Sequence, residues 1–348
     1  MTDKTIDQLV EGLSEKAERR FRLLREGKTK IVCRSIWLLI TRKCPFECRH
    51  CYFCGSPNGE SMTVDQVERV VNNLPTNLET LGISGGEPFT NPKLLKKTLE
   101  FIQTRNFPHL TNLTVQTLGF WARDRKRTIS KVSELIDLGV NSFYVYGNDS
   151  WHIEQGLNPQ NPELLVDVLA NEFGAIEPEK MMSLNYLFDR DTITYSTRKT
   201  GQILPIGRGK WGTTENEWQR VDTNPVCPCR DFLKLNPNGY HYIVNFNGEV
   251  HFCLYQTAPS LGNIFERPLT QILKNARRRD IFQIMNRGDV REFASEITDN
   301  SQQVAEKAIS ERGRCIYCID LLEKHFENRT DKPVLYSVFE KEKCRSDS

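Results

Sequence analysis

Three cysteines lie within eight residues of one another near the start of the chain. Cys44, Cys48 and Cys51 form a C-x-x-x-C-x-x-C array inside segment 41–54, TRKCPFECRHCYFC. Thiols this close cannot form disulfides with one another without strain, and thiolates are the ligands that select zinc or iron–sulfur clusters. Zinc usually takes two cysteine pairs, whereas a 4Fe–4S cluster held by three thiolates keeps one iron open for a reactant. The array therefore favours an iron–sulfur cluster.

The other cysteines are grouped as well. Of the 11 cysteines, five lie in 33–54, six lie in 227–344, and none lies between. A secreted disulfide scaffold would spread its cysteines differently and would carry a signal peptide, whereas the N-terminal residues here are acidic and lack an apolar core. We therefore expect two metal-binding clusters in a reducing cytoplasm.

Composition excludes several classes of protein. The longest apolar run, Ile36–Ile40, is far too short to span a bilayer. The formal charge of +2 gives no reason to expect nucleic acid or an anionic membrane as a partner. A chain of 348 residues is long enough for one large or two modest domains.

From residue 33 the sequence alternates short apolar runs with amphipathic segments, about forty residues per repeat. Helices are predicted from a capping box at Thr63 and Gln66, from Asn91-Pro92, before Gly139, and from Asn161-Pro162, with a further one over 4–26. Five βα repeats indicate a parallel sheet, open or closed, with its chemistry at the C-terminal strand ends. The predicted strands are Ser35–Thr41, Glu79–Ser84, Leu113–Thr117, Ser142–Tyr146 and Met182–Leu187.

The pattern changes after residue 226. Two β-rich runs, Tyr240–Phe246 and Glu249–Tyr255, flank Asn247-Gly248, which is a strong hairpin signal. Cys253 lies on the second run. Cys227 and Cys229 precede the hairpin, and Cys315-x-x-Cys318 follows it.

The first array resembles the cluster loop of radical S-adenosylmethionine (SAM) enzymes, including an aromatic-type residue, His50, before the third cysteine. A second motif, Gly85-Gly86-Glu87-Pro88, is similar to the turn that holds the methionyl amino group of SAM in this superfamily. The resemblance implies an α/β fold, a partial (β/α)6 barrel. It also implies that Cys44, Cys48 and Cys51 hold a 4Fe–4S cluster whose open iron binds SAM.

Three more residues match the superfamily in part. Thr117 ends the third strand where relatives have a T-N-G turn, although Leu118 departs from it. Arg208 resembles a sixth-strand arginine near the cofactor carboxylate; a surface turn arginine is the alternative. His152 matches a family stretch after the fourth strand, where it would be a substrate contact, a general base or a structural histidine.

The second cysteine group resembles the twitch (shortened SPASM) domain of many radical SAM enzymes. The resemblance implies that Cys229, Cys253, Cys315 and Cys318 ligate an auxiliary 4Fe–4S cluster, although structural zinc fits the count equally. Cys227 is the alternative to Cys229 for the first ligand position. If Cys229 is the ligand, Cys227 is either a hydrogen donor to the substrate or a structural residue. For Cys33, Cys54 and Cys344 we expect free buried thiols.

These matches predict four segments: an N-terminal helical segment 1–32, the barrel 33–220, the twitch/SPASM domain 221–325 and a tail 326–348. The predicted enzyme cleaves SAM reductively to a 5′-deoxyadenosyl radical, abstracts hydrogen from an unactivated carbon, and uses the auxiliary cluster for oxidation or epimerisation in natural-product (aminoglycoside-like) tailoring. A flavodoxin or ferredoxin would supply electrons. One alternative is a maturase of ribosomally made peptides. Such enzymes commonly have a leader-binding domain, for which the segment before the barrel is too short, and this favours a small-molecule substrate. The other is a non-enzymatic electron carrier or zinc scaffold.

Overall fold

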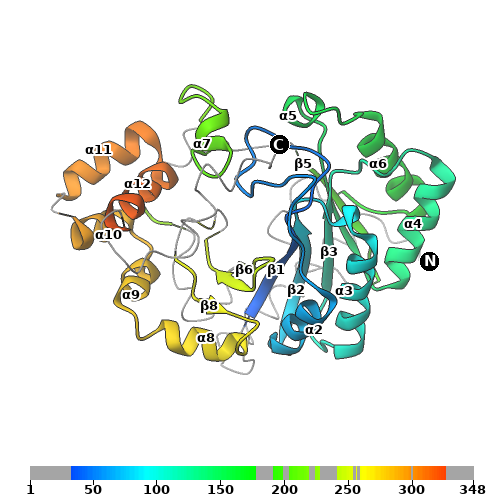
Figure 1. Ribbon diagram of the computed structural model, residues 1–348, viewed down its shortest axis with the longest axis horizontal. Coiled ribbons are helices and arrows are strands. Elements are labelled where there is room, and N and C mark those ends of the chain that lie inside the picture. The colour runs from blue at the N-terminus through cyan, green and yellow to red at the C-terminus, as the bar shows by residue number, and fades with distance from the viewer. Residues whose placement is uncertain are drawn as a thin grey trace, which may run out of the picture.

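The computed structural model of this chain describes residues 33–177, 191–198, 204–218, 224–227, 241–253, 256, 259–298 and 301–326 (Figure 1). The predicted helix over 4–26, the predicted strand Met182–Leu187, Cys229 and Cys344 lie outside these residues. In the described part of the chain, no helix is long and apolar enough to cross a membrane.

The strands are β1 (Cys33–Thr41), β2 (Leu78–Gly85), β3 (Asn112–Thr117), β4 (Ser142–Tyr146), β5 (Thr194–Arg198), β6 (His241–Val244), β7 (Glu249–His251) and β8 (Gly262–Asn263). The helices of the first half are α2 (Val64–Asn73), the 3₁₀ turn η1 (Pro88–Thr90), α3 (Pro92–Arg105), α4 (Arg125–Asp137), α5 (Ser150–Ile153) and α6 (Gln160–Phe173). Those of the second half are α7 (Gly209–Gly212), α8 (Leu269–Ala276), α9 (Asp280–Arg287), α10 (Val290–Ile297), α11 (Gln302–Arg312) and α12 (Arg314–Phe326).

The eight strands of the described residues form one sheet in the order β5-β4-β3-β2-β1-β6-β7-β8. Neighbouring strands from β5 to β6 run parallel, and β7 and β8 are antiparallel additions at the β6 edge. The predicted α/β fold with a parallel sheet core is confirmed. The first four strands lie where the sequence places them, within one or two residues.

The sequence did not predict which segments occupy two places in the sheet; the predicted strand Met182–Leu187 lies outside the described residues and stays untested. The strand beside β4 is Thr194–Arg198. The sixth parallel strand is β6, which pairs with β1. Pro205–Arg208, the expected sixth strand, is a turn leading into α7, because Gly207 has a left-handed φ of 53° and lies against the Tyr52 carbonyl oxygen.

The helices begin where the sequence predicts caps. Thr63 and Gln66 form both bonds of the capping box at α2, and the Asn91 side chain accepts from Leu94 N at the start of α3. Helices α2, α3, α4 and α6 cover one face of the strands, to the right in Figure 1. Apolar side chains pack in the core on this outer face: Ile36, Leu38, Leu81, Ile83, Val115 and Phe143.

The opposite face, here called the inner face, carries the alternate residues. Trp37 of β1 pairs with Gly82 of β2, and a Cβ at Gly82 would lie 2.4 Å from the indole ring. The missing side chain therefore lets the indole lie across β2, where its centroid is 5.5 Å from that of Tyr144 on β4. The register places mostly polar side chains on this face: Thr80, Ser84, Thr114, Gln116 and Ser142.

The second half of the chain extends the same sheet. The hairpin of β6 and β7 closes around Asn247-Gly248 as predicted, and α8 to α12 lie to the left of the sheet in Figure 1. Because β6 pairs with β1, the cysteine loop after β1 and Cys253 after β7 follow strands of one continuous sheet, whereas Cys315 and Cys318 lie on α12.

Candidate active site

The three-cysteine loop begins three residues after β1. Cys44 and Cys48 are buried and Cys51 is half-buried, and all three are free thiols. Burial raises the pKa of Cys44 well above its usual range and that of Cys48 to about 12, and the neighbouring Cys51 raises both further. Thiolates are therefore favoured here only beside a positive centre, which fits a metal cluster. Within the described residues, no group of three or more His, Cys, Asp or Glu side chains is arranged to hold a single metal ion.

The Gly-Gly-Glu turn after β2 is bonded directly to this loop. Gly86 N donates to Thr41 O (2.7 Å) and Glu87 N donates to Lys43 O (2.8 Å). A Cβ at Gly85 would lie 2.2 Å from Thr41 O, and one at Gly86 would lie 2.5 Å from Lys43 O. Both glycines are needed because the two backbones touch.

Glu87 lies at the centre of this contact and is fully buried. Its carboxylate accepts hydrogen bonds from Phe89 N (3.1 Å), Leu118 N (2.6 Å) and Thr117 Oγ1 (3.0 Å). Burial raises the pKa of Glu87 to about 7, although these three hydrogen bonds lower it. No lysine or arginine of the described residues forms an ion pair with Glu87. A carboxylate has about four acceptor positions. The site therefore suits one further donor that brings a positive charge, such as an ammonium group.

Arg208 binds backbone atoms of the cysteine loop. Its backbone N donates to Cys51 O (3.0 Å), and its guanidinium donates to the carbonyl oxygens of Cys48 (3.1 Å) and Gly55. The arginine therefore stabilises the loop, and two of its guanidinium N–H groups bind protein carbonyl oxygens.

His50 and His152 face each other beside the loop. Their ring centroids are 5.3 Å apart, and His152 Nδ1 is hydrogen-bonded to Asp149 Oδ1 at 2.9 Å. Burial, together with His152, lowers the pKa of His50 to about 4, so His50 is neutral at physiological pH. Arg49 joins the group by stacking 4.2 Å above the Trp151 ring.

A cavity of about 620 Å³ opens beside the loop. It lies between the loop, the segment after β3 and the connection from α5 to α6. Its walls combine apolar and aromatic groups with amides and one cation, including Phe46, Phe120, Arg123, Leu157, Asn158 and Asn161.

The structure brings four thiols of the second group together. Burial raises the pKa of Cys315 to about 11, and the thiols of Cys253 and Cys227 raise it further. Burial also raises the pKa of Cys318, with Cys227, Cys253 and Cys315 adding to the rise. Cys227 therefore lies among the thiols that the sequence assigned to the auxiliary cluster, whereas the assignment of Cys229 stays a prediction.

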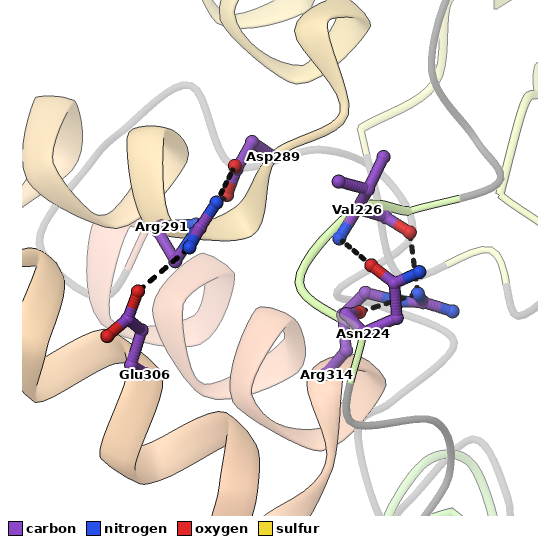
Figure 2. A network of polar contacts seen from close by, with 6 residues as sticks. All are labelled: Asn224, Val226, Asp289, Arg291, Glu306 and Arg314. Carbon is purple, nitrogen blue, oxygen red and sulfur yellow. Dashed lines mark hydrogen bonds and ion pairs between the residues drawn. The ribbon is translucent and has the colours of Figure 1, made fainter.

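Arg314 fixes Cys227 relative to α12. This buried arginine directly precedes Cys315 and donates to the carbonyl oxygens of Asn224 and Val226, each at 2.7 Å (Figure 2). Cys227 N donates to Gly288 O at 2.7 Å. Sequence reasoning missed Arg314, whose only signal was its position next to the C-x-x-C.

Cys54 contradicts the expectation of a free thiol. It is buried, with 1% of its surface exposed, and takes part in a disulfide bond. Its backbone is left-handed (φ 53°), and its N–H donates to Cys51 O at 3.4 Å.

Comparison with known families covers both cysteine groups. Residues 38–149 match the Radical SAM superfamily, and residues 237–298 match SPASM, an iron–sulfur cluster-binding domain. No curated protein matches the chain.

Several solved structures resemble the chain at low identity. BtrN in complex with AdoMet and 2-DOIA is 16% identical, with a TM-score of 0.44 over 75% of this chain and 89% of that chain. Native anSMEcpe with bound AdoMet is 13% identical, with a TM-score of 0.44 over 85% of this chain and 100% of that chain. Streptococcus suis SuiB bound to the precursor peptide SuiA is 12% identical, with a TM-score of 0.32 over 78% and 71%.

The fold and the two thiol groups define an iron–sulfur protein, with the first group in the loop after β1 and two thiols of the second group on α12. With the family matches, the chain belongs to the radical SAM superfamily and carries a SPASM domain. It is a radical SAM enzyme whose cofactors are S-adenosylmethionine and 4Fe–4S clusters.

Proposed function

We propose that this enzyme abstracts a hydrogen atom from an unactivated carbon of a small molecule, with an auxiliary cluster that supports oxidation or epimerisation in natural-product tailoring. The observation that carries the proposal is the buried Glu87 carboxylate, which is joined to the three-thiol loop through the Gly-Gly backbone contact. An electron carrier or a zinc scaffold has no use for such a carboxylate.

Each motif residue takes a separate role in this proposal. Cys44, Cys48 and Cys51 hold the cluster, and Glu87 accepts from the cofactor's amino group while Thr117 orients the carboxylate. When bound, the cluster and SAM supply the 5′-deoxyadenosyl radical. Arg208 keeps the loop in position by binding its carbonyl oxygens.

His152 is proposed as a substrate contact near this centre. Its bond to Asp149 leaves Nε2 as the ring nitrogen that can meet a substrate, since Nδ1 is already engaged. His50, held neutral by burial, presents no competing positive charge to the cofactor.

For the auxiliary cluster we propose Cys227, Cys253, Cys315 and Cys318 as ligands. The electrostatic coupling of these four thiols supports this set. Cys229 stands two residues from Cys227 across Pro228, and we assign it no ligand position.

A small-molecule substrate is supported by the cavity beside the loop. Its volume of about 620 Å³ falls within the usual range for small-ligand sites. Its mixture of amides, aromatic rings and one arginine suits a polar molecule.

Anaerobic reconstitution with iron and sulfide tests the proposal. We expect about eight irons per chain and release of 5′-deoxyadenosine from SAM with dithionite. A variant with Cys44, Cys48 and Cys51 all changed to Ala serves as the control, and it should keep about four irons and release none. Zinc in place of iron, or equal release by the control, would reject the proposed function.

A further inference from the structure

The cavity beside the cysteine loop has one charged group in its wall. Among the described residues that line it, Arg123 is the only charged one, and no carboxylate lines it. The other walls combine apolar groups, including the Phe46 and Phe120 rings, with side-chain amides such as those of Asn158 and Asn161. The cavity wall therefore supplies no negative partner for this arginine.

One hydrogen bond fixes the orientation of Arg123. Its Nε donates to Phe120 O at 3.2 Å, and the same oxygen accepts from Asn161 Nδ2 at 2.9 Å. The shared acceptor places the guanidinium beside the Asn161 amide. In the part of the chain that the structure describes, the terminal guanidinium nitrogens of Arg123 make no hydrogen bond or ion pair. This planar pair of nitrogens is therefore left for an acceptor with two oxygens.

The acidic groups nearest to Arg123 in the chain are already engaged. Arg125, two residues further on, forms ion pairs with Asp167 and Glu172 of α6. Asp124, between the two arginines, caps α4 by accepting from a backbone N–H of its first turn at 2.9 Å. Arg123 thus differs from Arg125 in having no carboxylate of the described chain as its partner.

The amides beside Arg123 add a second requirement. Asn158 Oδ1 accepts from Gln160 N at 3.1 Å, which leaves Asn158 Nδ2 as a donor. The bond from Asn161 Nδ2 to the backbone leaves Asn161 Oδ1 as an acceptor. Neither of these remaining atoms has a partner among the described residues. A hydroxyl group both donates and accepts, so it satisfies either amide, while the apolar walls suit a carbon ring or chain.

We propose that Arg123 is a specificity-determining residue that binds the anionic group, a carboxylate or a phosphate, of a hydroxylated small-molecule substrate. The proposal rests on the proposed function for the identity of the cavity as the substrate site. Two oxygens of either anion match the free edge of the guanidinium. Amino sugars are disfavoured, because their ammonium group would meet a second cation.

The test uses the reconstituted full chain without SAM or reductant and four probes that share one sugar ring. Glucuronate carries a carboxylate, glucose 6-phosphate a phosphate, glucose no charge and glucosamine a cation. Saturation-transfer NMR titrations give the dissociation constant of each probe. For one or both anions we expect a value about fivefold or more below those of glucose and glucosamine. The tighter anion identifies the anionic group.

Two variants of Arg123 separate its charge from its shape. In Arg123→Gln, the dissociation constants of the anionic probes should rise to the glucose value, and Arg123→Lys should recover part of the affinity because it keeps the charge without the planar fork. Exposed Arg127 lies on the first turn of the same helix and does not line the cavity. Arg127→Gln removes the same charge and should bind all four probes as the wild type does.

Four results would overturn the assignment. Glucose or glucosamine bound as tightly as the anions would reject the substrate class, and no binding of any probe would reject the cavity as their site. Unchanged anion affinity in Arg123→Gln would remove this residue from the site, and an equal loss in Arg127→Gln would reduce the effect to surface charge. Because no step uses SAM cleavage, these failures are distinguishable from failure of the radical chemistry, which appears as missing 5′-deoxyadenosine.

Discussion

At the scale of single residues, Glu87 is a buried acid whose partner is the cofactor in our proposal. Burial raises its pKa to about 7, above the ordinary 4.5, so the folded protein without ligand binds more protons than the unfolded chain between these values. Stability contributed by this group is therefore present at low pH and is lost as pH rises from about 4.5 to 7, by up to about 3 kcal/mol.

The same titration predicts how SAM affinity changes with pH. An ammonium group prefers ionised Glu87, so affinity should rise about fivefold from pH 6 to 7, where an α-amino group with a pKa of about 7.7–8.0 is still mostly protonated. Anaerobic calorimetry measures this rise, and Glu87→Gln should bind weakly with no rise. A wild-type affinity independent of pH would contradict the role of Glu87.

The two cysteines flanking Pro228 offer a second prediction at this scale. Cys227→Ser should lose about four of about eight irons, because Cys227 lies with three other thiols, whereas Cys229→Ser should keep them. Iron counting after identical reconstitution compares the two variants directly. The opposite pattern would return the ligand position to Cys229.

At the scale of elements, the start of α12 is held by one buried arginine. Arg314→Met removes two charge-assisted bonds to the segment before Cys227, each worth about 1.5–3 kcal/mol. We expect a loss of about 3–6 kcal/mol in free energy of unfolding together with the auxiliary irons.

Arg291 supplies the matched control from the same region (Figure 2). It pairs with Asp289 and Glu306 but is 30% exposed, so Arg291→Met should destabilise the protein far less than Arg314→Met and keep all the irons. Equal losses in the two variants, measured by urea unfolding and iron counting, would mean that Arg314 has no special role.

Local patterns explain which elements the sequence predicts well. The caps at Thr63 and Asn91 and the first four strands depend on neighbouring residues, and the structure confirms them. Thr194–Arg198 lacks an apolar alternation, and its pairing with β4 is a long-range contact. The sequence therefore did not reveal this strand.

The site is predicted in part for the same reason. The thiols and the Gly-Gly-Glu turn are visible as motifs, and the structure brings the loop and the turn together. The bonds from Arg314 to the carbonyl oxygens of Asn224 and Val226 cross 90 and 88 positions of the chain, which no spacing in the sequence encodes.

At the scale of the whole molecule, β1 is an interior strand only because β6 pairs with it. A fragment ending at residue 220 exposes that side of β1 and the unpaired backbone groups along it, and such an edge promotes aggregation. We predict that the fragment is insoluble or unfolds without a cooperative transition, by circular dichroism and size-exclusion chromatography. A monomeric fragment with cooperative unfolding would instead make 33–220 an independent domain.

The bond from Arg208 to Cys48 O joins residues 160 positions apart. At a synthesis rate of about 5–20 residues per second, the ribosome needs roughly 8–30 s to make the intervening chain. During that interval the three thiols have left the ribosome while the arginine that holds their loop has not yet been made. Until residue 208 is made the loop lacks this contact, and the nascent thiols are exposed to oxidation.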